Sequence, residues 1–258
     1  MESGKDVLEG GAVYNTTGTT GCGIGNVADS LMAIKMAFDG RLGCTPKELG
    51  DALSANWAGY EDLQKKIIYE MPHYGNNVEE VDELAVWAMS SFADTLNSLT
   101  GPRGHYNAGT FTMTVHLSYG AMTDATPDGR KRGEPLAEAI SPRQGFDKNG
   151  PTAYLISASK LPHKKLGNGD QLNIRFSPSV VQNEQGTRKL RDLISTYFAQ
   201  GGMQVQFNVV STTTLHDAQE TPEKYKNLIV RIAGFSAYFV EMPKVMQDDF
   251  ISRTECQL

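Results

Sequence analysis

The spacing of apolar residues predicts a mainly helical region before about residue 100. The clearest predicted helix covers residues 78–99, and its apolar face comprises Val81, Leu84, Ala85, Ala88, Phe92 and Leu96. Another begins at Asn26, a better N-cap than Asp29, with an apolar face of Val27, Leu31, Ile34 and Phe38. Thr45 precedes a proline and an acid in the first turn, which predicts a helix to about residue 55. A further amphipathic helix is expected over residues 60–69.

After residue 100 the pattern alternates between strands and helices. Residues 109–117 are rich in β-branched and aromatic side chains and predict a strand. Further strands are expected at 172–176, 203–210 and 228–233, and helices at 186–199, 211–219 and 247–254. Strand, helix and strand in succession indicate a βαβ unit and an α/β fold. With no repeat or linker, we expect one domain over residues 1–258, mainly helical over 1–100 and mixed over 101–258.

Composition and charge exclude several classes of protein. Hydrophobic residues make up 40% and charged residues 21%, a balance that permits a buried core. The net charge is −6, and the longest basic run, residues 130–132, is too short for a nucleic-acid surface. No segment approaches the ~20 apolar residues that span a bilayer, and the N-terminus lacks a signal peptide pattern. These features predict a cytoplasmic protein without membrane or nucleic-acid partners.

Cysteines and histidines indicate neither disulfides nor a metal site. Cys22, Cys44 and Cys256 are odd in number and lack C-x-x-C spacing, which favours a reducing compartment. The five histidines are dispersed without the spacing of metal ligands. His116 is weighed as a pocket residue, but an ordinary histidine is favoured. The glycine-rich run 18–25 resembles a phosphate cradle, yet it lacks the P-loop pattern, so nucleotide binding is disfavoured.

Two motifs near the C-terminus carry the chemistry. Residues 230–237 read VRIAGFSA, and residues 247–254 read QDDFISRT. The first motif places an arginine, then apolar and small residues, before a glycine and an aromatic residue. The second motif, an acidic helix, follows about a dozen residues later. Together they resemble the C-terminal signature of the pyruvate formate-lyase superfamily. Supporting matches cover nearly the whole chain, at residues 29–31, 125–130, 150–153, 205–209, 217–219 and 222–225. The sequence is therefore similar to the C-terminal part of a glycyl radical enzyme.

The resemblance implies that Gly234 stores a radical. A Cα radical is stabilised by delocalisation over the flanking amide groups, and glycine has no Cβ to oppose a planar centre. In the family, an activating enzyme with an iron–sulfur cluster and S-adenosylmethionine removes one Cα hydrogen, so the radical is a modification and no cofactor is bound. Arg231, Phe235 and Ser236 are expected to present the glycine loop, residues 230–237, to this activase; packing and a surface charge are the alternative.

The resemblance also implies an α/β barrel of two half-barrels, of which this chain supplies the glycine half. Gly234 is expected to be buried inside it, away from water and oxygen, and residues 230–258 to loosen when the activase binds. The family's thiyl cysteine lies in a Cys-x-x-Pro-like context upstream. Cys22, Cys44 and Cys256 all lack that context, so we assign none and expect the cysteine on a preceding segment or another polypeptide.

The type of reaction stays open at this point. The runs AGFSAYFV and ATPDGR are closer to the diol dehydratase, choline lyase and arylacetate decarboxylase branch than to pyruvate formate-lyase itself. We therefore expect an oxygen-sensitive lyase of anaerobic metabolism that acts on a small molecule and is a homodimer when complete. An acyltransferase of the pyruvate formate-lyase type is the alternative enzyme. A non-catalytic radical-bearing subunit, or a replacement module for a damaged enzyme, is the alternative of another class.

Overall fold

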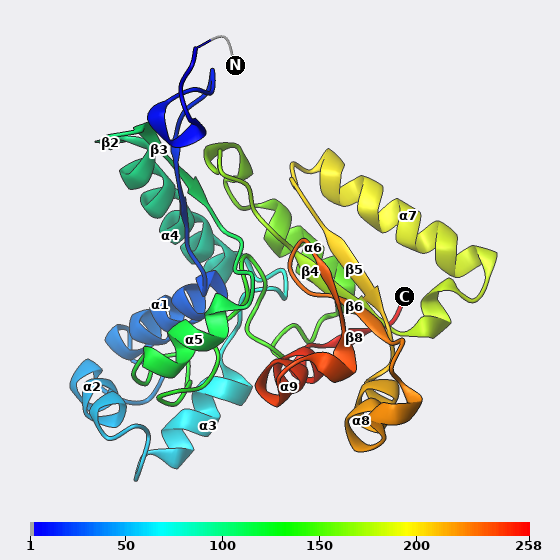
Figure 1. Ribbon diagram of the computed structural model, residues 1–258. Helices are drawn as coiled ribbons and strands as arrows, with labels where there is room; N and C mark the ends of the chain where they lie inside the picture. Colours follow the sequence, from blue (N-terminus) through cyan, green and yellow to red (C-terminus); the bar gives the residue numbers. More distant parts are fainter. Residues whose placement is uncertain (1–2) are drawn as a thin grey trace.

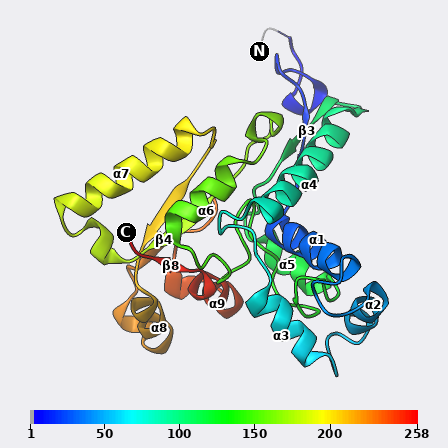
Figure 2. The same ribbon diagram turned by 180° about the vertical axis from the view of Figure 1, so that it is seen from behind.

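The computed structural model describes residues 3–258; Met1 and Glu2, with which the expected domain begins, lie outside the described residues. One side of the molecule holds the helices α1 (Ile24–Phe38), α2 (Pro46–Ser54), α3 (Glu61–Glu70) and α4 (Glu79–Asn97). The other side holds a parallel sheet with α7 (Glu184–Ala199), α8 (Thr212–Glu220) and α9 (Lys244–Ser252) (Figure 1; Figure 2). The predicted α/β class is confirmed.

The helical side forms around the packing of α1 on α4. Beside them, β1 (Thr17–Thr20) runs parallel to β3 (Gly104–Gly109), and β2 (Thr100–Gly101) pairs antiparallel with β3. The predicted α2 is confirmed, because Thr45 and Glu48 form a reciprocal capping box at its start. The predicted face of α4 is also confirmed, since Val81 and Ala85 are fully buried and Phe92 packs against the same core.

The parallel sheet positions the candidate site. Its central strand β4 (Asn173–Phe176) lies between β5 (Gln206–Val209) and β8 (Glu255–Cys256). Helix α7 joins β4 to β5, as the predicted βαβ order requires, and packs on α6 (Gly150–Ser159). Asn173 lies opposite Gln206 and Arg175 opposite Asn208, so these four polar side chains share one face of the sheet.

A hairpin follows the sheet, and it belongs to a second hydrophobic cluster. Strands β6 (Ile229–Arg231) and β7 (Ser236–Tyr238) pair antiparallel. The hairpin, α8 and α9 share a small core of Val210, Leu215, Ala218, Val230, Ile232, Ala233, Phe239, Met242 and Phe250. The larger core lies under α1, α4, α6 and β4. The hairpin therefore packs mainly with its neighbours along the chain.

The strand predicted over residues 109–117 is wrong. Strand β3 ends at Gly109, and Val115–Met122 is the helix α5. Met113 and Thr114 adopt φ of 43° and 76°, which interrupts an extended chain, and Thr20 bonds both backbone groups of Phe111 in the loop between. Tertiary contacts thus override the β propensity of this run.

The predicted start and apolar face of α1 are also wrong. The N-cap is Gly23, and Asn26 is buried inside the helix, where its side chain bonds Asp128 and the N–H of Ala137, each at 2.6 Å. The apolar residues Val27, Ile34 and Phe38 are exposed, whereas the buried face includes Ala28, Met32, Ala33 and Ala37. The three alanines on this buried face allow α1 to pack closely on α4.

Within residues 3–258, no helix has the length and apolarity needed to cross a membrane.

Candidate functional site

Gly234 lies at the tip of the β6–β7 hairpin. The N–H of Ile232 donates to the carbonyl of Phe235 at 2.9 Å and closes the turn. Gly234 has φ of +79°, in the left-handed region that favours glycine, and no atom lies within 4 Å of the place a Cβ would occupy. Its Cα is therefore unobstructed, and a side chain is excluded by backbone conformation more than by space.

The expected burial of Gly234 is not found in this chain, where the glycine is exposed. The parallel sheet below it has three strands, and among residues 3–258 no element covers the hairpin tip. The barrel that the resemblance implies needs further strands to enclose the glycine.

Three side-chain amides on the sheet hold the hairpin, and we call Asn173, Gln206 and Asn208 the amide cradle. Asn208 accepts the N–H of Arg231 and donates to its carbonyl, both at 2.7 Å. Asn173 donates to the carbonyl of Ile232 at 3.1 Å. Gln206 Oε1 accepts the N–H of Gly234 at 3.2 Å. All three amides are more than 90% buried, so they are fixed by the strands that carry them.

The other residues predicted at the site surround the glycine. Arg231 is half-buried, with its Nε 3.1 Å from Gln206 Oε1 and a guanidinium nitrogen 3.5 Å from the hydroxyl of Ser236. Ser236 is exposed, and Phe235 exposes 42% of its surface beside Gly234. The structure therefore brings together Gly234, Arg231, Phe235 and Ser236. Phe235 and Ser236 are open to a partner.

The C-terminal motif 247–254 fixes α9 to the body through a buried charge cluster. Arg253 lies 3.1 Å from both Glu138 and Asp249, and Gln144 donates to Asp249 at 2.8 Å. His116, fully buried on α5, places Nε2 at 3.2 Å from Asp249. Burial raises the pKa of Asp249, but Arg253 and His116 outweigh it and lower the pKa to about 2. These contacts pack the C-terminal motif onto the core of the chain.

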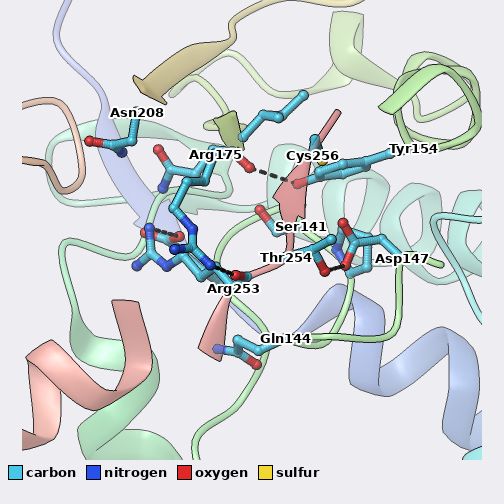
Figure 3. A pocket seen from close by; sticks show the side chains of 13 residues that line it. Ser141, Gln144, Asp147, Tyr154, Arg175, Asn208, Arg253, Thr254 and Cys256 are labelled. Atoms are coloured by element: carbon cyan, nitrogen blue, oxygen red, sulfur yellow. Dashed lines mark hydrogen bonds and ion pairs between the residues drawn. The ribbon is translucent and has the colours of Figure 1, made fainter. Parts of the chain in front are cut away.

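A small cavity lies between this cluster and the amide cradle (Figure 3). Its walls include Asn208 and Arg175 on one side and Tyr154 and Asp147 on the other. About 30 Å³ is open to water, enough for one or two molecules. Arg175 lines the cavity and donates to the carbonyls of Ile251 and Arg253, which ties β4 to the end of α9.

The three cysteines have raised pKa values and are neutral thiols. Burial raises the pKa of Cys22 to about 11 and that of Cys256 to about 12. Burial, assisted by Glu48, also raises the pKa of Cys44. Burial outweighs the nearby charges of Lys66 and Arg175, so all three sulfurs are neutral thiols and none is an activated nucleophilic thiolate.

The buried histidines pair with carboxylates instead of metal. His73 Nδ1 lies 2.9 Å from Asp29, His163 pairs with Asp170, and His116 pairs with Asp249. Across residues 3–258, no three histidine, cysteine or acidic side chains converge as a metal site would require. His116 thus lies on a helix and joins the charge cluster.

Sequence comparison places the chain in a family. Residues 136–240 match the family described as "Glycine radical", and residues 1–120 match "Pyruvate formate lyase-like". Trans-4-hydroxy-L-proline dehydratase of Clostridioides difficile is 40% identical over 99% of this chain and 32% of its own length. Isethionate sulfite-lyase of Bilophila wadsworthia is 40% identical over 90% of this chain and 28% of its own length.

Structural comparison agrees. The B12-independent glycerol dehydratase from Clostridium butyricum superposes with a TM-score of 0.95 at 41% identity, covering 100% of this chain and 33% of that one. The chain therefore belongs to the glycyl radical enzyme superfamily, as the C-terminal motifs predicted. It spans about a third of the length of the relatives it matches.

The amide cradle is the part of the site that sequence reasoning missed. From the sequence alone, the run 205–209 predicts a strand and a family match but no role for its side chains. A signal was present, because Gln206 and Asn208 alternate along a strand and must face the same way. Their contact with the glycine hairpin depends on the pairing of β4 with β5 and on a hairpin more than twenty residues away.

The charge cluster predicts unequal effects of neighbouring acids on α9. Asp249→Asn should lower the free energy of unfolding by about 3 kcal/mol, because Arg253 loses a buried partner. Asp248→Asn, the matched control, removes an exposed ion pair with Lys244 and should have a much smaller effect. Urea unfolding at pH 7 measures both. Equal losses would contradict the assignment.

The stabilisation that Asp249 contributes depends on pH. The pKa of Asp249 is lower in the folded chain than its ordinary value of about 3.9, so its stabilisation is complete above that value. Stabilisation is lost as the pH falls through about 2. The difference between the parent chain and Asp249→Asn should therefore narrow between pH 4 and 2 in the same unfolding experiment.

Proposed function

We propose that this chain stores a radical on Gly234 and transfers it to a cysteine thiol that acts on a small substrate. The observation that carries the proposal is the exposed, side-chain-free Cα at the tip of the hairpin, inside the region that matches the glycine radical family. Abstraction of one Cα hydrogen leaves an unpaired electron shared with the flanking amides. The open turn at Gly234 lets a hydrogen-abstracting group reach that atom.

The proposed partner is an activating enzyme that uses S-adenosylmethionine and an iron–sulfur cluster. The cluster belongs to that enzyme, and we propose no bound cofactor for this chain. Arg231, Phe235 and Ser236 are proposed to be recognised by it. Support comes from the exposure of Phe235 and Ser236 beside the glycine, and from the bond that holds Arg231 against Gln206.

The thiyl cysteine is proposed to lie on another segment, either earlier in the same polypeptide or in a partner subunit. Support comes from the sequence around Cys22, Cys44 and Cys256, since none of the three lies in the Cys-x-x-Pro-like context of the family's thiyl cysteine. With that segment, we propose a cytoplasmic homodimer that encloses Gly234 away from oxygen.

The proposed reaction is that of a dehydratase or lyase acting on a small polar molecule. Relatives of both kinds match across 90% or more of the chain, which supports this branch over an acyltransferase. A radical-bearing subunit without catalysis of its own is the second candidate, and it is favoured for the chain in isolation because none of its three cysteines has the family's sequence context.

Gly234→Ala should abolish radical formation. The chain, the activase and S-adenosylmethionine are incubated without oxygen, and a doublet is expected in the EPR spectrum of the parent protein. Gly40→Ala is the matched control, because Gly40 has φ of +80° and equally free space around a Cβ. Both substitutions should cost about 1 kcal/mol of stability. A doublet of full intensity in Gly234→Ala would overturn the proposal.

Phe235→Ala should slow radical formation without lowering stability. Phe235 is partly exposed at the hairpin tip, so its loss removes contact area for a partner and little of the core. We expect about tenfold slower activation at low chain concentration, equivalent to the ~1.4 kcal/mol of an aromatic contact. The measurement is the initial rate of EPR signal growth. An unchanged rate would remove Phe235 from the proposed recognition surface.

Binding of the activase should increase amide hydrogen exchange in residues 230–258. The amide cradle holds the N–H of Gly234, and insertion of the hairpin tip into the active site of another enzyme is expected to break that bond. Mass spectrometry of peptic peptides measures this, with α4 as the internal reference because its core face is fully buried. Exchange in residues 230–258 that does not change when activase is bound would contradict the proposed loosening.

A further inference from the structure

The glycine hairpin is attached to the sheet by side chains alone. Strand β6 pairs only with β7, and within residues 3–258 no backbone–backbone hydrogen bond joins residues 228–238 to β4 or β5. The polar links are those of the amide cradle to Arg231, Ile232 and Gly234. Therefore the hairpin can leave and return without opening a strand pair of the parallel sheet.

Gln206 has a special place in the cradle, because it alone bonds the glycine. Its Oε1 accepts from Gly234 N–H at 3.2 Å and from Arg231 Nε at 3.1 Å. Its Nε2 donates to Asn173 Oδ1 and lies 3.4 Å from the carbonyl oxygen of Ile232. These bonds fix which end of the amide faces the glycine, since the nitrogen end already has acceptors. Asn208, in contrast, bonds only Arg231.

We propose that Gln206 is the positioning residue of the radical glycine: its Oε1 holds the Gly234 amide and tunes the radical that forms there. This inference rests on the proposed storage of a radical at Gly234. An acceptor on the N–H increases electron density at the amide nitrogen, one of the atoms over which the unpaired electron is delocalised. The same bond keeps the nitrogen oriented while the Cα becomes planar.

The structure also explains why an amide suits this position. A carboxylate would accept equally well but could not donate to Asn173, and an apolar side chain would leave the Gly234 N–H and Arg231 Nε without their partner. A neutral amide on a buried strand therefore holds the hairpin through hydrogen bonds of moderate strength, which re-form when the hairpin returns.

The test compares Gln206→Leu, Gln206→Glu and Asn208→Leu in the chain. Hydrogen exchange without activase reports attachment, and residues 229–238 should exchange roughly tenfold faster in Gln206→Leu. The spectroscopic readout is the coupling of the exchangeable Gly234 amide proton, measured by ENDOR on the activated chain in H₂O and D₂O. That coupling should change in Gln206→Leu and be restored in Gln206→Glu, whose oxygen still accepts.

Asn208→Leu separates attachment from tuning. It should also speed exchange, because the clasp on Arg231 is lost, yet it should leave the amide-proton coupling as in the parent chain. If Gln206→Leu leaves both exchange and coupling unchanged, or if Asn208→Leu alters the coupling as much, the proposal is overturned. Circular dichroism checks folding, and Gln206→Met, which keeps the length of the side chain but has no oxygen acceptor, takes the place of the leucine variant if that variant does not fold.

Failure of the proposed function has a different outcome. If the parent chain gives no radical with an activase that activates its own substrate protein, storage at Gly234 is refuted. Hydrogen exchange then tests the structural part of the Gln206 proposal without a radical. Faster exchange in Gln206→Leu supports Gln206 as the residue that holds the glycine, and unchanged exchange refutes this role.

Discussion

The hydrogen bonds from the amide cradle to the glycine hairpin are the interaction on which the site depends. A radical-storing residue must be held in one geometry and still be reachable by another enzyme. Main-chain pairing with the sheet would hold the hairpin too firmly for an activase to reach the glycine. A hairpin without any bond to the sheet would have no fixed geometry. Side-chain amides on buried strands meet both needs, because the donors and acceptors are fixed while the bonds they make are individually modest.

The hairpin and α9 are adjacent in the chain but differ in how they are attached. Helix α9 is fixed by the buried charges of Asp249, Arg253 and Glu138, and by β8, which pairs with the central strand β4. The hairpin shares a hydrophobic cluster with α8 and α9 and has no strand pairing to the sheet. A firmly held anchor on the C-terminal side thus limits how far the glycine can travel.

Sequence reasoning predicted the elements that local patterns determine. Short-range rules predict the capping box at Thr45, the apolar face of α4 and the βαβ unit around α7. The two C-terminal motifs predict the family in the same way, from residues close together in the sequence. The failures lie where distant contacts decide. Residues 109–117 become a loop and a helix because Thr20 bonds Phe111, and α1, which packs on α4, buries its alanines instead of the predicted apolar face. The amide cradle could not be predicted for the same reason, since Gln206 contacts Gly234 only in the folded sheet.

The central claim is that the radical resides on Gly234, and cleavage by oxygen tests it most directly. A Cα radical in the main chain reacts with oxygen, and the chain then breaks at the residue that carried it. The activated chain is exposed to air and its fragments are weighed by intact-mass spectrometry. The account predicts one break, at Gly234, that depends on both activase and S-adenosylmethionine. Cleavage at another glycine, or none in a chain that carries a confirmed radical, would contradict it.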